Sequence, residues 1–333
     1  MNLIIIGASG LVGQEFIKLI SQDKHFPKDL NIILVGSNNS KGSDVNINYN
    51  YYKIITLDDI NWNEDSIYIN CADKEQAKEI GNKKSFNSIL IDNSSYYRLN
   101  EYVPLVIPEI NFPIEKHNIY ANPNCSTIIL NLLLKPLLDN FGIRRVVVST
   151  YQAASGAGKN GVNELVTQLG EMFLSQNPDS LTKTFWKKQY IYNTFVHNSP
   201  INIETGYNEE EEKIVNETNK IFNRNIPISA TCIRVPVLRS HCESVNVELE
   251  KGTNYNDLLS ILQKCDYLEI MDDKQNKIFP ESITSNTKMK VQVGHIREDF
   301  SLDKRKGWNF WISSDQLLRG AAGNAYNIFK KLI

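Results

Sequence analysis

Short apolar runs and amphipathic segments alternate along the first third of the chain. Four of the runs hardly alternate between apolar and polar residues, which is typical of strands buried on both faces. These predicted strands are Leu3–Ile6, Ile32–Val35, Ile67–Ile69 and Ile89–Ile91. Segments with helical periodicity, Gln14–Ser21 and Lys74–Lys83, lie between them. This β-α-β order predicts a parallel sheet with right-handed crossovers.

The pattern changes after about residue 125, where the predicted strands are longer and alternate more clearly. Strands are predicted at Val146–Ala153, Ile228–Val237, Ser244–Glu250, Lys290–Arg297 and Trp308–Ser313, and helices at Gly161–Leu174, Glu209–Phe222 and Asn256–Lys264. Such strands indicate a second, mixed or antiparallel sheet. The most loop-like stretch is Asn193–Asn208, and the tail Gln316–Leu332 is a predicted helix that folds back on the first domain. We therefore expect one domain over residues 1–125, completed by a C-terminal helix over 315–333, and a second over 126–314.

Composition narrows the class of protein. The 333 residues are enough for two domains. A net charge of −2 argues against a nucleic-acid partner, and no apolar run approaches the ~18 residues of a membrane span. The chain begins with a strand rather than a basic leader, so no signal peptide is expected. Its five cysteines show no C-x-x-C spacing, which predicts neither disulfides nor a metal site and favours a cytoplasmic location.

A glycine-rich segment, Gly7–Gly13, follows the first predicted strand and opens a helix. Its G-x-x-G-x-x-G spacing is a variant of the dinucleotide fingerprint, in which a tight turn brings main-chain N–H groups to a pyrophosphate. A simple strand–helix turn is the alternative. The strand–turn–helix context favours the cofactor site, with contacts from Gly7, Ser9, Gly10, Leu11, Val12 and Gly13.

The end of the second predicted strand indicates which dinucleotide binds. NAD-binding chains place Asp or Glu there, to bind the ribose 2′-hydroxyl. This chain instead has Gly36–Lys41, in which Ser37, Ser40 and Lys41 suit a 2′-phosphate. The segment predicts NADP, although the same residues would also make an ordinary polar turn.

One cysteine has the surroundings of a nucleophile. Pro123 ends a strand, and Cys125 falls in the first turn of a helix that includes Ile128–Leu138. The helix dipole and unpaired amides there stabilise a thiolate and lower its pKa. The other cysteines, Cys71, Cys232, Cys242 and Cys265, are expected to be buried and inert.

A thiolate nucleophile also needs a proton carrier, for which the chain offers five histidines. His25 and His117 lie in polar stretches. His241 lies in a predicted loop between two strands, a place where functional groups are often presented. It is the first candidate, followed by His295 and His197.

Seven segments in order resemble the aspartate-semialdehyde dehydrogenase family, and the resemblance runs through almost the whole chain. They are Gly7–Gly13, Asp92–Arg98, Val103–Asn111, Asn122–Thr127, Ser149–Gly158, Arg234–His241 and Ser314–Ala322. The resemblance implies an α/β fold, with a Rossmann-type parallel sheet and a second α+β domain, with a mixed sheet, for catalysis and dimerisation.

The resemblance also implies roles for individual residues. Cys125 would be the nucleophile, His241 the general acid–base and Gln152 the residue that orients the acyl-enzyme intermediate. The substrate and its phosphate would be bound by Arg98, Asn124, Glu210, Lys213 and Arg234, and the cofactor also by Ser155, Gly156 and Gln316. Among the substrate residues, Arg234 would clamp the α-carboxylate. A solvated charge run is the alternative for Glu209–Lys213.

The implied activity is the NADPH-dependent reduction of L-aspartyl 4-phosphate to L-aspartate 4-semialdehyde and phosphate through a cysteine thioester. It belongs to lysine, threonine and methionine biosynthesis, and relatives are homodimers or homotetramers. The chain departs from the family at Asn39, where many members have Arg, and Lys41 is the expected substitute. Alternatives are an N-acetyl-γ-glutamyl-phosphate reductase and a non-catalytic nucleotide-binding relative.

Overall fold

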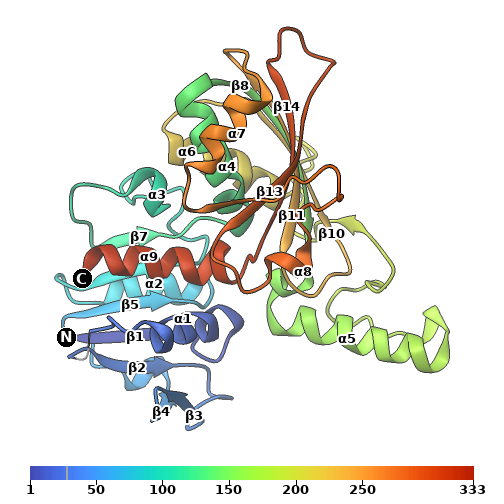
Figure 1. Ribbon diagram of the computed structural model, residues 1–333. Helices are drawn as coiled ribbons and strands as arrows, with labels where there is room; N and C mark the ends of the chain where they lie inside the picture. The colour runs from blue at the N-terminus through green and yellow to red at the C-terminus, as the bar shows by residue number, and fades with distance from the viewer. Residues whose placement is uncertain (28) are drawn as a thin grey trace. The chain divides into compact units, whose positions relative to one another are not determined.

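The computed structural model describes residues 1–27 and 29–333, which divide into two compact units (Figure 1). Unit 1 comprises Met1–Asn124, Lys220–Phe222 and Gly320–Ile333, and unit 2 comprises Cys125–Asn219 and Asn223–Arg319. The described residues of each unit contain one seven-stranded sheet. One sheet is mostly parallel and the other is mixed, so the predicted fold class is confirmed.

The sheet of unit 1 has the strand order β3-β4-β2-β1-β5-β6-β7. Its strands are β1 (Asn2–Ile6), β2 (Asn31–Val35), β3 (Asp44–Ile47), β4 (Asn50–Ile55), β5 (Ser66–Asn70), β6 (Ile89–Asp92) and β7 (Ile119–Ala121). The four predicted strands are found as β1, β2, β5 and β6, all parallel to their neighbours in the order β2-β1-β5-β6. Side chains of β1 reach two separate apolar clusters, Leu3 and Ile5 in one and Ile4 and Ile6 in the other, so the strand is buried on both faces as predicted.

The helical segments of unit 1 are α1 (Leu11–Gln22), the 3₁₀ turn η1 (Leu57–Asp59), α2 (Lys74–Lys83), α3 (Pro108–Asn111) and α9 (Gly323–Leu332). Three of them, α1, α2 and α9, correspond to predicted helices. The bounds of α2 match the prediction, because the Asp73 carboxylate caps it by accepting the Glu75 N–H. The tail does fold back on unit 1, where Tyr326 packs edge-on against Phe16 of α1. It begins later than predicted, as one π turn (η4, Leu318–Ala322) followed by α9.

The sheet of unit 2 has the order β12-β13-β14-β11-β8-β10-β9. Its strands are β8 (Ile143–Gln152), β9 (Phe195–Val196), β10 (Ile228–Arg234), β11 (His241–Leu249), β12 (Leu268–Ile270), β13 (Val291–Glu298) and β14 (Gly307–Ser314). Its helical segments are α4 (Cys125–Phe141), η2 (Ala154–Ala157), α5 (Gly158–Ser175), η3 (Pro178–Ser180), α6 (Glu209–Phe222, whose last turn belongs to unit 1), α7 (Tyr255–Gln263) and α8 (Ser282–Ser285). Every second residue of β8, from Val146 to Gln152, is buried, so one face of the strand lies in the core.

Three predictions about unit 2 need correction. The predicted strand Ile228–Val237 ends at Arg234, shortly before Pro236, which lacks the N–H that a strand ladder needs. His241 is not in a loop: it is the first residue of β11, where it pairs with Ser314 of β14. The loop Asn193–Asn208 includes the short strand β9, which pairs with the end of β10.

Candidate active site

The glycine-rich turn of unit 1 is closed so tightly that side chains are excluded from it. Gly7 has φ +76°, and a Cβ there would lie 2.9 Å from the Cys71 carbonyl; a Cβ on Gly13 would lie 2.3 Å from the Gly7 oxygen. The N–H groups of Gly7 and Ala8 both donate to the Val35 oxygen, at 2.9 and 3.0 Å, which fixes the turn at the ends of β1 and β2. The turn therefore has the close-packed geometry of a dinucleotide-binding loop.

A cavity of about 600 Å³ opens beside this turn, at the carboxyl ends of β1, β2, β4 and β5. Among the predicted cofactor residues, its lining contains Gly7, Ser9, Gly10 and Ser37. Leu11, Val12 and Gly13 form the first turn of α1. The lining also includes Cys71–Asp73, a segment that the sequence analysis did not assign.

Ser40 and Lys41 do not line this cavity. The Ser9 hydroxyl donates to the Ser40 Oγ at 3.4 Å, while the Lys41 ammonium forms an ion pair with Asp59 at 2.9 Å.

Cys125 is the first residue of α4 and is half-buried. Cys232 and Cys242 are buried, as predicted, whereas Cys71 and Cys265 are half-buried. Burial raises the pKa of the Cys71 thiol to about 12 and that of the Cys232 thiol further still. These two thiols therefore stay protonated at neutral pH, whereas Cys125 has the amide groups of a helix start around it.

Gln152 links the start of α4 to the start of α6. It is the last residue of β8, and its side-chain amide donates to the Ser126 Oγ at 3.1 Å and to the Glu210 Oε1 at 3.2 Å. Because Ser126 follows Cys125, this amide group is anchored next to the candidate nucleophile.

His241 is the first residue of β11, which pairs with β8, and its side chain is fully buried. Its Nδ1 accepts the Ala153 N–H at 3.0 Å, so a neutral ring carries its proton on Nε2, for which the described residues provide no hydrogen-bond partner. Burial, followed by the charge of Arg234, lowers the pKa of His241 to about 3. The ring is therefore neutral at pH 7 and presents an N–H donor.

Arg234 ends β10 beside this ring. Its Nη1 donates to the Ala153 oxygen at 3.0 Å, its Nε donates to the Asn198 Oδ1 at 3.4 Å, and its guanidinium lies 5.5 Å from the centre of the Trp186 ring. A Cβ on Gly156 would lie 3.0 Å from Nη1 and 3.1 Å from the His241 Nε2. A side chain at this position would require Arg234 or His241 to shift by a few tenths of an ångström, so glycine suits the close approach of the main chain to both groups.

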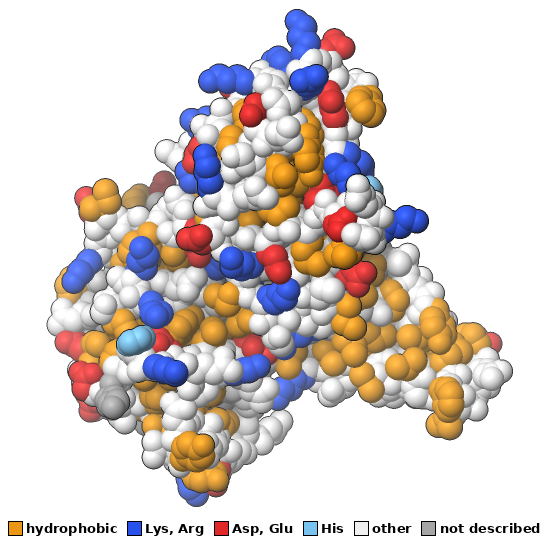
Figure 2. Space-filling view, viewed as in Figure 1, with side chains coloured by type: hydrophobic (Ala, Val, Ile, Leu, Met, Phe, Trp, Pro, Cys, Tyr) orange, Lys and Arg blue, Asp and Glu red, His pale blue; other side chains and the backbone are white. Residues whose placement is uncertain are grey.

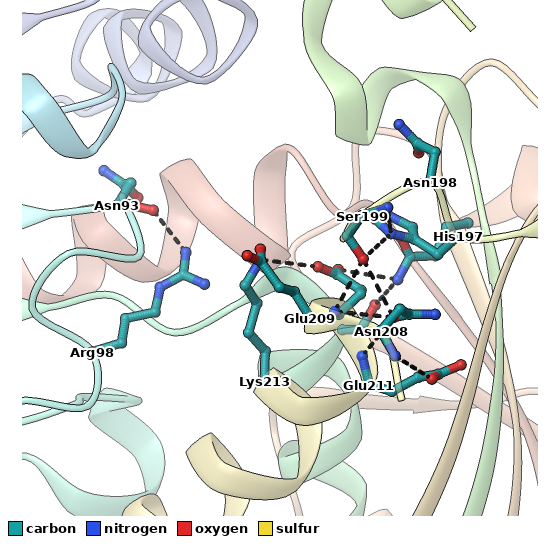
Figure 3. A network of polar contacts seen from close by, with 12 residues as sticks. Asn93, Arg98, His197, Asn198, Ser199, Asn208, Glu209, Glu211 and Lys213 are labelled. Carbon is teal, nitrogen blue, oxygen red and sulfur yellow. Dashed lines mark hydrogen bonds and ion pairs between the residues drawn. The ribbon is translucent and has the colours of Figure 1, made fainter. Parts of the chain in front are cut away.

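The four consecutive glutamates at the start of α6 differ in their contacts. Glu210 contacts Gln152 and forms an ion pair with Lys213 at 3.6 Å. Glu211 instead accepts the N–H groups of Asn208, at 2.9 Å, and Cys232, at 3.0 Å. Figure 3 shows Lys213, Asn208 and Glu211 in this network. The charge run is thus not simply a solvated surface, since two of its members are buried.

His197 joins the same cluster, although it was only the third candidate. It is buried, and its Nδ1 accepts the Ser199 N–H at 3.2 Å (Figure 3). Burial, and next the charge of Arg234, lowers its pKa to about 4. His295 lies apart, exposed at a register shift between β13 and β14.

The remaining candidates lie in both units. In unit 1, buried Arg98 donates from Nη2 to the Asn93 oxygen at 2.8 Å (Figure 3), and buried Asn124 is the last residue before unit 2 begins. In unit 2, the Gln316 side chain donates to the Ser155 hydroxyl and accepts the Ser240 N–H at 2.8 Å. This places Ser155 and Gln316 next to the strand position of His241.

Sequence reasoning missed Ser126, Trp186 and Asn198 as neighbours of the reactive groups. Ser126 has a local signal, since it follows Cys125. Trp186 and Asn198 reach Arg234 from a distant segment, for which the sequence has no local signal.

The described residues contain no group of three or more His, Cys, Asp or Glu side chains that would hold a metal ion. Within the same part of the chain, no helix is long and apolar enough to cross a membrane.

Comparison with known proteins follows the same division of the chain. Residues 2–117 match the family described as "Semialdehyde dehydrogenase, NAD binding domain", and residues 134–319 match "Semialdehyde dehydrogenase, dimerisation domain". The chain is 36% identical to a Campylobacter jejuni protein named aspartate-semialdehyde dehydrogenase, over 99% of this chain and 96% of that protein. It is 35% identical to the protein of the same name from Aquifex aeolicus, over 100% and 98%.

Solved structures agree with these relatives. Aspartate semialdehyde dehydrogenase II from Vibrio cholerae superimposes with a TM-score of 0.91 at 32% identity, covering 99% of this chain and 98% of that one. The structure of the same enzyme complexed with ASA gives a TM-score of 0.89 at 32% identity, over 99% and 97%. The geometry, the two matched domains and the full-length relatives establish that the chain belongs to the aspartate-semialdehyde dehydrogenase family.

Proposed function

We propose that this chain is an NADP-dependent aspartate-semialdehyde dehydrogenase, which reduces L-aspartyl 4-phosphate to L-aspartate 4-semialdehyde and phosphate in the biosynthesis of lysine, threonine and methionine. The observation that carries the proposal is the cluster in unit 2, where Gln152 joins the helix turn of Cys125 to Glu210, beside buried His241 and Arg234. The full-length relatives support the aspartate substrate over the N-acetyl-γ-glutamyl one.

The first step is proposed at Cys125. Its thiolate attacks the acyl carbon, a C–S bond forms, the bond from that carbon to the phosphate oxygen breaks, and phosphate leaves. The developing oxyanion accepts hydrogen bonds from main-chain N–H groups at the start of α4. Gln152 orients the thioester, since both of its neighbours belong to the turns that carry the cluster.

The second step reduces the thioester. The glycine turn and its cavity fit a dinucleotide, and the bound cofactor supplies the hydride. The His241 Nε2–H donates to the oxygen of the resulting thiohemiacetal. The C–S bond then breaks, its electrons return to the Cys125 sulfur as the thiolate, and the oxygen held by the Nε2–H becomes the carbonyl oxygen of the aldehyde, so the ring keeps its proton and stays neutral over the cycle. The proton that the overall reaction consumes ends on the phosphate.

Substrate binding follows from the charges of the cluster. The Arg234 fork suits the α-carboxylate, and the Glu210 carboxylate suits the α-ammonium group. Lys213, Arg98 and Asn124 are proposed for the phosphate, by the family resemblance. Ser155, Gly156 and Gln316 are proposed to contact the cofactor.

Unit 1 is proposed as the dinucleotide-binding domain and unit 2 as the domain for catalysis and dimerisation. The family description of residues 134–319 supports a homo-oligomer, a homodimer or homotetramer. One face of α5 carries the exposed side chains of Val166, Leu169 and Phe173, at i, i+3 and i+7, and Figure 2 shows apolar side chains along this helix. Five reduced thiols agree with a cytoplasmic location.

Purified Cys125→Ala tests the proposal. It is expected to lose phosphate-dependent NADPH formation from aspartate semialdehyde, while Cys265→Ala, a matched half-buried thiol, keeps it. Activity of Cys125→Ala within tenfold of the wild type would contradict the role of this thiol. Assaying N-acetylglutamate semialdehyde in parallel separates the reductase alternative. For a non-catalytic relative, substrate would not protect Cys125 from iodoacetamide.

A further inference from the structure

The cavity beside the glycine turn has an acidic rim. Because β2 and β4 are parallel neighbours, with Val35 opposite Ile55, their carboxyl ends meet at one edge of the sheet. Gly36–Asn38 and Thr56–Asp58, which follow these strands, line the same cavity. This edge is where a dinucleotide-binding sheet recognises the adenosine ribose.

The charged side chains of the lining all carry carboxylates: Asp58, Asp73 and Glu79. Among the residues that the structure describes, no Lys or Arg lines this cavity. A ribose 2′-phosphate brings close to two negative charges to the rim, whereas a 2′-hydroxyl is neutral and donates to a carboxylate. Asp58 can therefore accept a hydrogen bond from the 2′-hydroxyl of NAD, whereas it would repel the 2′-phosphate of NADP.

Lys41 is the cation predicted to bind a 2′-phosphate, and its ammonium group forms an ion pair with Asp59. The Lys41 Nζ lies 2.9 Å from one Asp59 oxygen and 3.2 Å from the other. Asp59 is itself fixed, because its carboxylate accepts the Thr56 N–H at 2.9 Å and the Thr56 hydroxyl at 2.8 Å. The Lys41 hydrogen bonds, and next those of Thr56, hold the pKa of Asp59 well below its usual range.

The turn that carries Lys41 is also fixed. The Ser40 N–H and hydroxyl both donate to the Ser37 oxygen, at 2.9 and 3.0 Å, and the Gly42 N–H donates to the Ile54 oxygen at 2.8 Å. Only the side chain of Lys41 is left to move. To bind a 2′-phosphate it must leave Asp59 or divide its charge between two anions.

We infer that the Lys41–Asp59 ion pair, together with Asp58, reduces the selectivity of this cavity for a 2′-phosphorylated adenosine, so that the chain binds NAD and NADP with affinities within about tenfold of each other. This inference rests on the proposed function, in which the cavity holds the cofactor. Asp59 restrains the binding of the 2′-phosphate, and Asp58 favours the hydroxyl.

Calorimetric titration of the full chain with 2′,5′-ADP and with 5′-ADP tests the inference without turnover. These ligands differ only in the phosphate on the 2′-oxygen. The wild type is expected to bind both, with dissociation constants within about tenfold. Asp59→Asn releases Lys41 and retains an acceptor oxygen for Thr56. It is expected to tighten the binding of 2′,5′-ADP about three- to tenfold and to leave the binding of 5′-ADP unchanged.

Two further variants separate the contributions. Lys41→Met is expected to weaken the binding of 2′,5′-ADP by a similar factor without affecting the binding of 5′-ADP. Asp58→Asn is expected to tighten the binding of 2′,5′-ADP and to weaken that of 5′-ADP. Lys330→Met is the matched control, because it breaks the exposed pair with Asp23 in the same unit, away from the lining of the cavity. Initial rates with NAD and NADP are expected to shift in the same direction as the ligand affinities.

The outcomes distinguish this inference from the proposed function. A wild-type preference above about 100-fold for 2′,5′-ADP would overturn the inference and leave the proposed function intact. An Asp59→Asn substitution that changes the affinity for both ligands by the same factor would do the same. Binding of neither ligand would overturn both.

Discussion

Each unit carries a lysine–carboxylate pair next to its candidate binding groups, and the two pairs differ in burial. The Lys41–Asp59 pair in unit 1 spans 2.9 Å, with side chains that are 52% and 38% exposed. The Lys213–Glu210 pair in unit 2 spans 3.6 Å, with side chains that are 27% and 8% exposed. Water screens the charges of the exposed Lys41–Asp59 pair more than those of the more buried Lys213–Glu210 pair. We therefore expect the electrostatic effect to be stronger in the Lys213–Glu210 pair, although its two charges lie farther apart.

This difference extends to the residues around each pair. The glycine turn of unit 1 offers main-chain N–H groups. The charged side chains at the rim of the cavity beside it adjust the selectivity between NAD and NADP. In unit 2, burial lowers the pKa of His241 to about 3 and of His197 to about 4, and it lowers the pKa of Arg234 too. We therefore expect substitutions in the buried cluster to have large effects, and substitutions at the rim of the unit 1 cavity to have effects of several-fold.

Arg234→Lys tests the largest effect. Lysine keeps the positive charge but loses the planar fork, the hydrogen bond to the Ala153 oxygen and the contact with Trp186. The expected loss in kcat/KM for aspartate semialdehyde is roughly 100- to 1,000-fold, or ~3–4 kcal/mol. Arg144→Lys, which alters an exposed pair with Glu248, is the control. A loss below tenfold would show that the planar fork and its contacts contribute little beyond the positive charge.

Glu210→Gln comes next and also tests the register of α6. The amide keeps the size of the side chain but removes the charge that faces Lys213 and balances Arg234. We expect kcat/KM to fall about 10- to 100-fold, equivalent to ~1.4–2.7 kcal/mol. Glu209→Gln, whose carboxylate also pairs with Lys213 but is exposed, should stay within about threefold. Equal losses in the two variants would contradict the assigned register.

The sequence predicted the elements that depend on local signals. Four strands of the first sheet, β1, β2, β5 and β6, were predicted because they are continuous apolar runs, and α2 was predicted because its residues have helical periodicity. Cys125 was placed at a helix start because Pro123 precedes it. The hairpin β3–β4 was missed because polar residues interrupt its apolar pattern, and most of its side chains are exposed or half-buried near the edge of the sheet.

Features that depend on pairing between distant segments were not predictable in this way. The Lys41–Asp59 pair forms because β2 and β4 are neighbours, and β4 itself was not predicted. His241 was placed in a loop because it lies between two predicted strands, although Ser314 of β14 pairs with it.

Glu243→Gln tests burial through stability rather than activity. Glu243 is fully buried on β11, two residues after His241, and neither of its carboxyl oxygens has a hydrogen-bond partner among the described residues. Burial raises its pKa well above the usual value. Above about pH 4.5 the unfolded chain releases this proton while the folded chain retains it, so the folded state loses stability as pH rises. Glutamine removes this loss.

The expected result is a pH-dependent difference in the free energy of unfolding. Between pH 5 and pH 6 the difference between Glu243→Gln and the wild type should grow by about 1 kcal/mol in favour of the variant. His241 acts in the opposite direction, since its lowered pKa removes stability as pH falls below 6.5, but it is present in both proteins and cancels. Denaturant unfolding measures the difference, with Glu248→Gln, on the same strand and paired with Arg144, as the control. A constant difference across this range would mean that Glu243 is ionised in the folded chain.

Trp186→Leu has the smallest expected effect in unit 2 and tests how the buried charge is positioned. Two side chains of α5 hold the segment that carries Trp186: Glu164 accepts the Trp186 N–H at 2.9 Å, and Gln168 accepts the Tyr190 N–H at 2.7 Å. Leucine keeps these main-chain contacts and removes the ring that faces Arg234, together with the hydrogen bond that the ring N–H donates to the Gly161 oxygen at 3.1 Å. We expect KM for aspartate semialdehyde to rise about fivefold, or ~1 kcal/mol, with kcat unchanged, since the ring orients the carboxylate clamp and does not touch the reacting carbon.

The matched control for this variant is Phe185→Leu, because Phe185 packs edge-on against Trp186, whereas in the part of the chain that the structure describes it is the Trp186 ring, not the Phe185 ring, that faces Arg234. Trp186→Phe should recover part of the loss, since a smaller aromatic face remains over the guanidinium. A fall in kcat at constant KM, or an equal effect of Phe185→Leu, would show that the ring serves packing alone. The contrast between the units would then rest on charge burial without any contribution from orientation, because Arg234 would hold its position through Ala153 and Asn198.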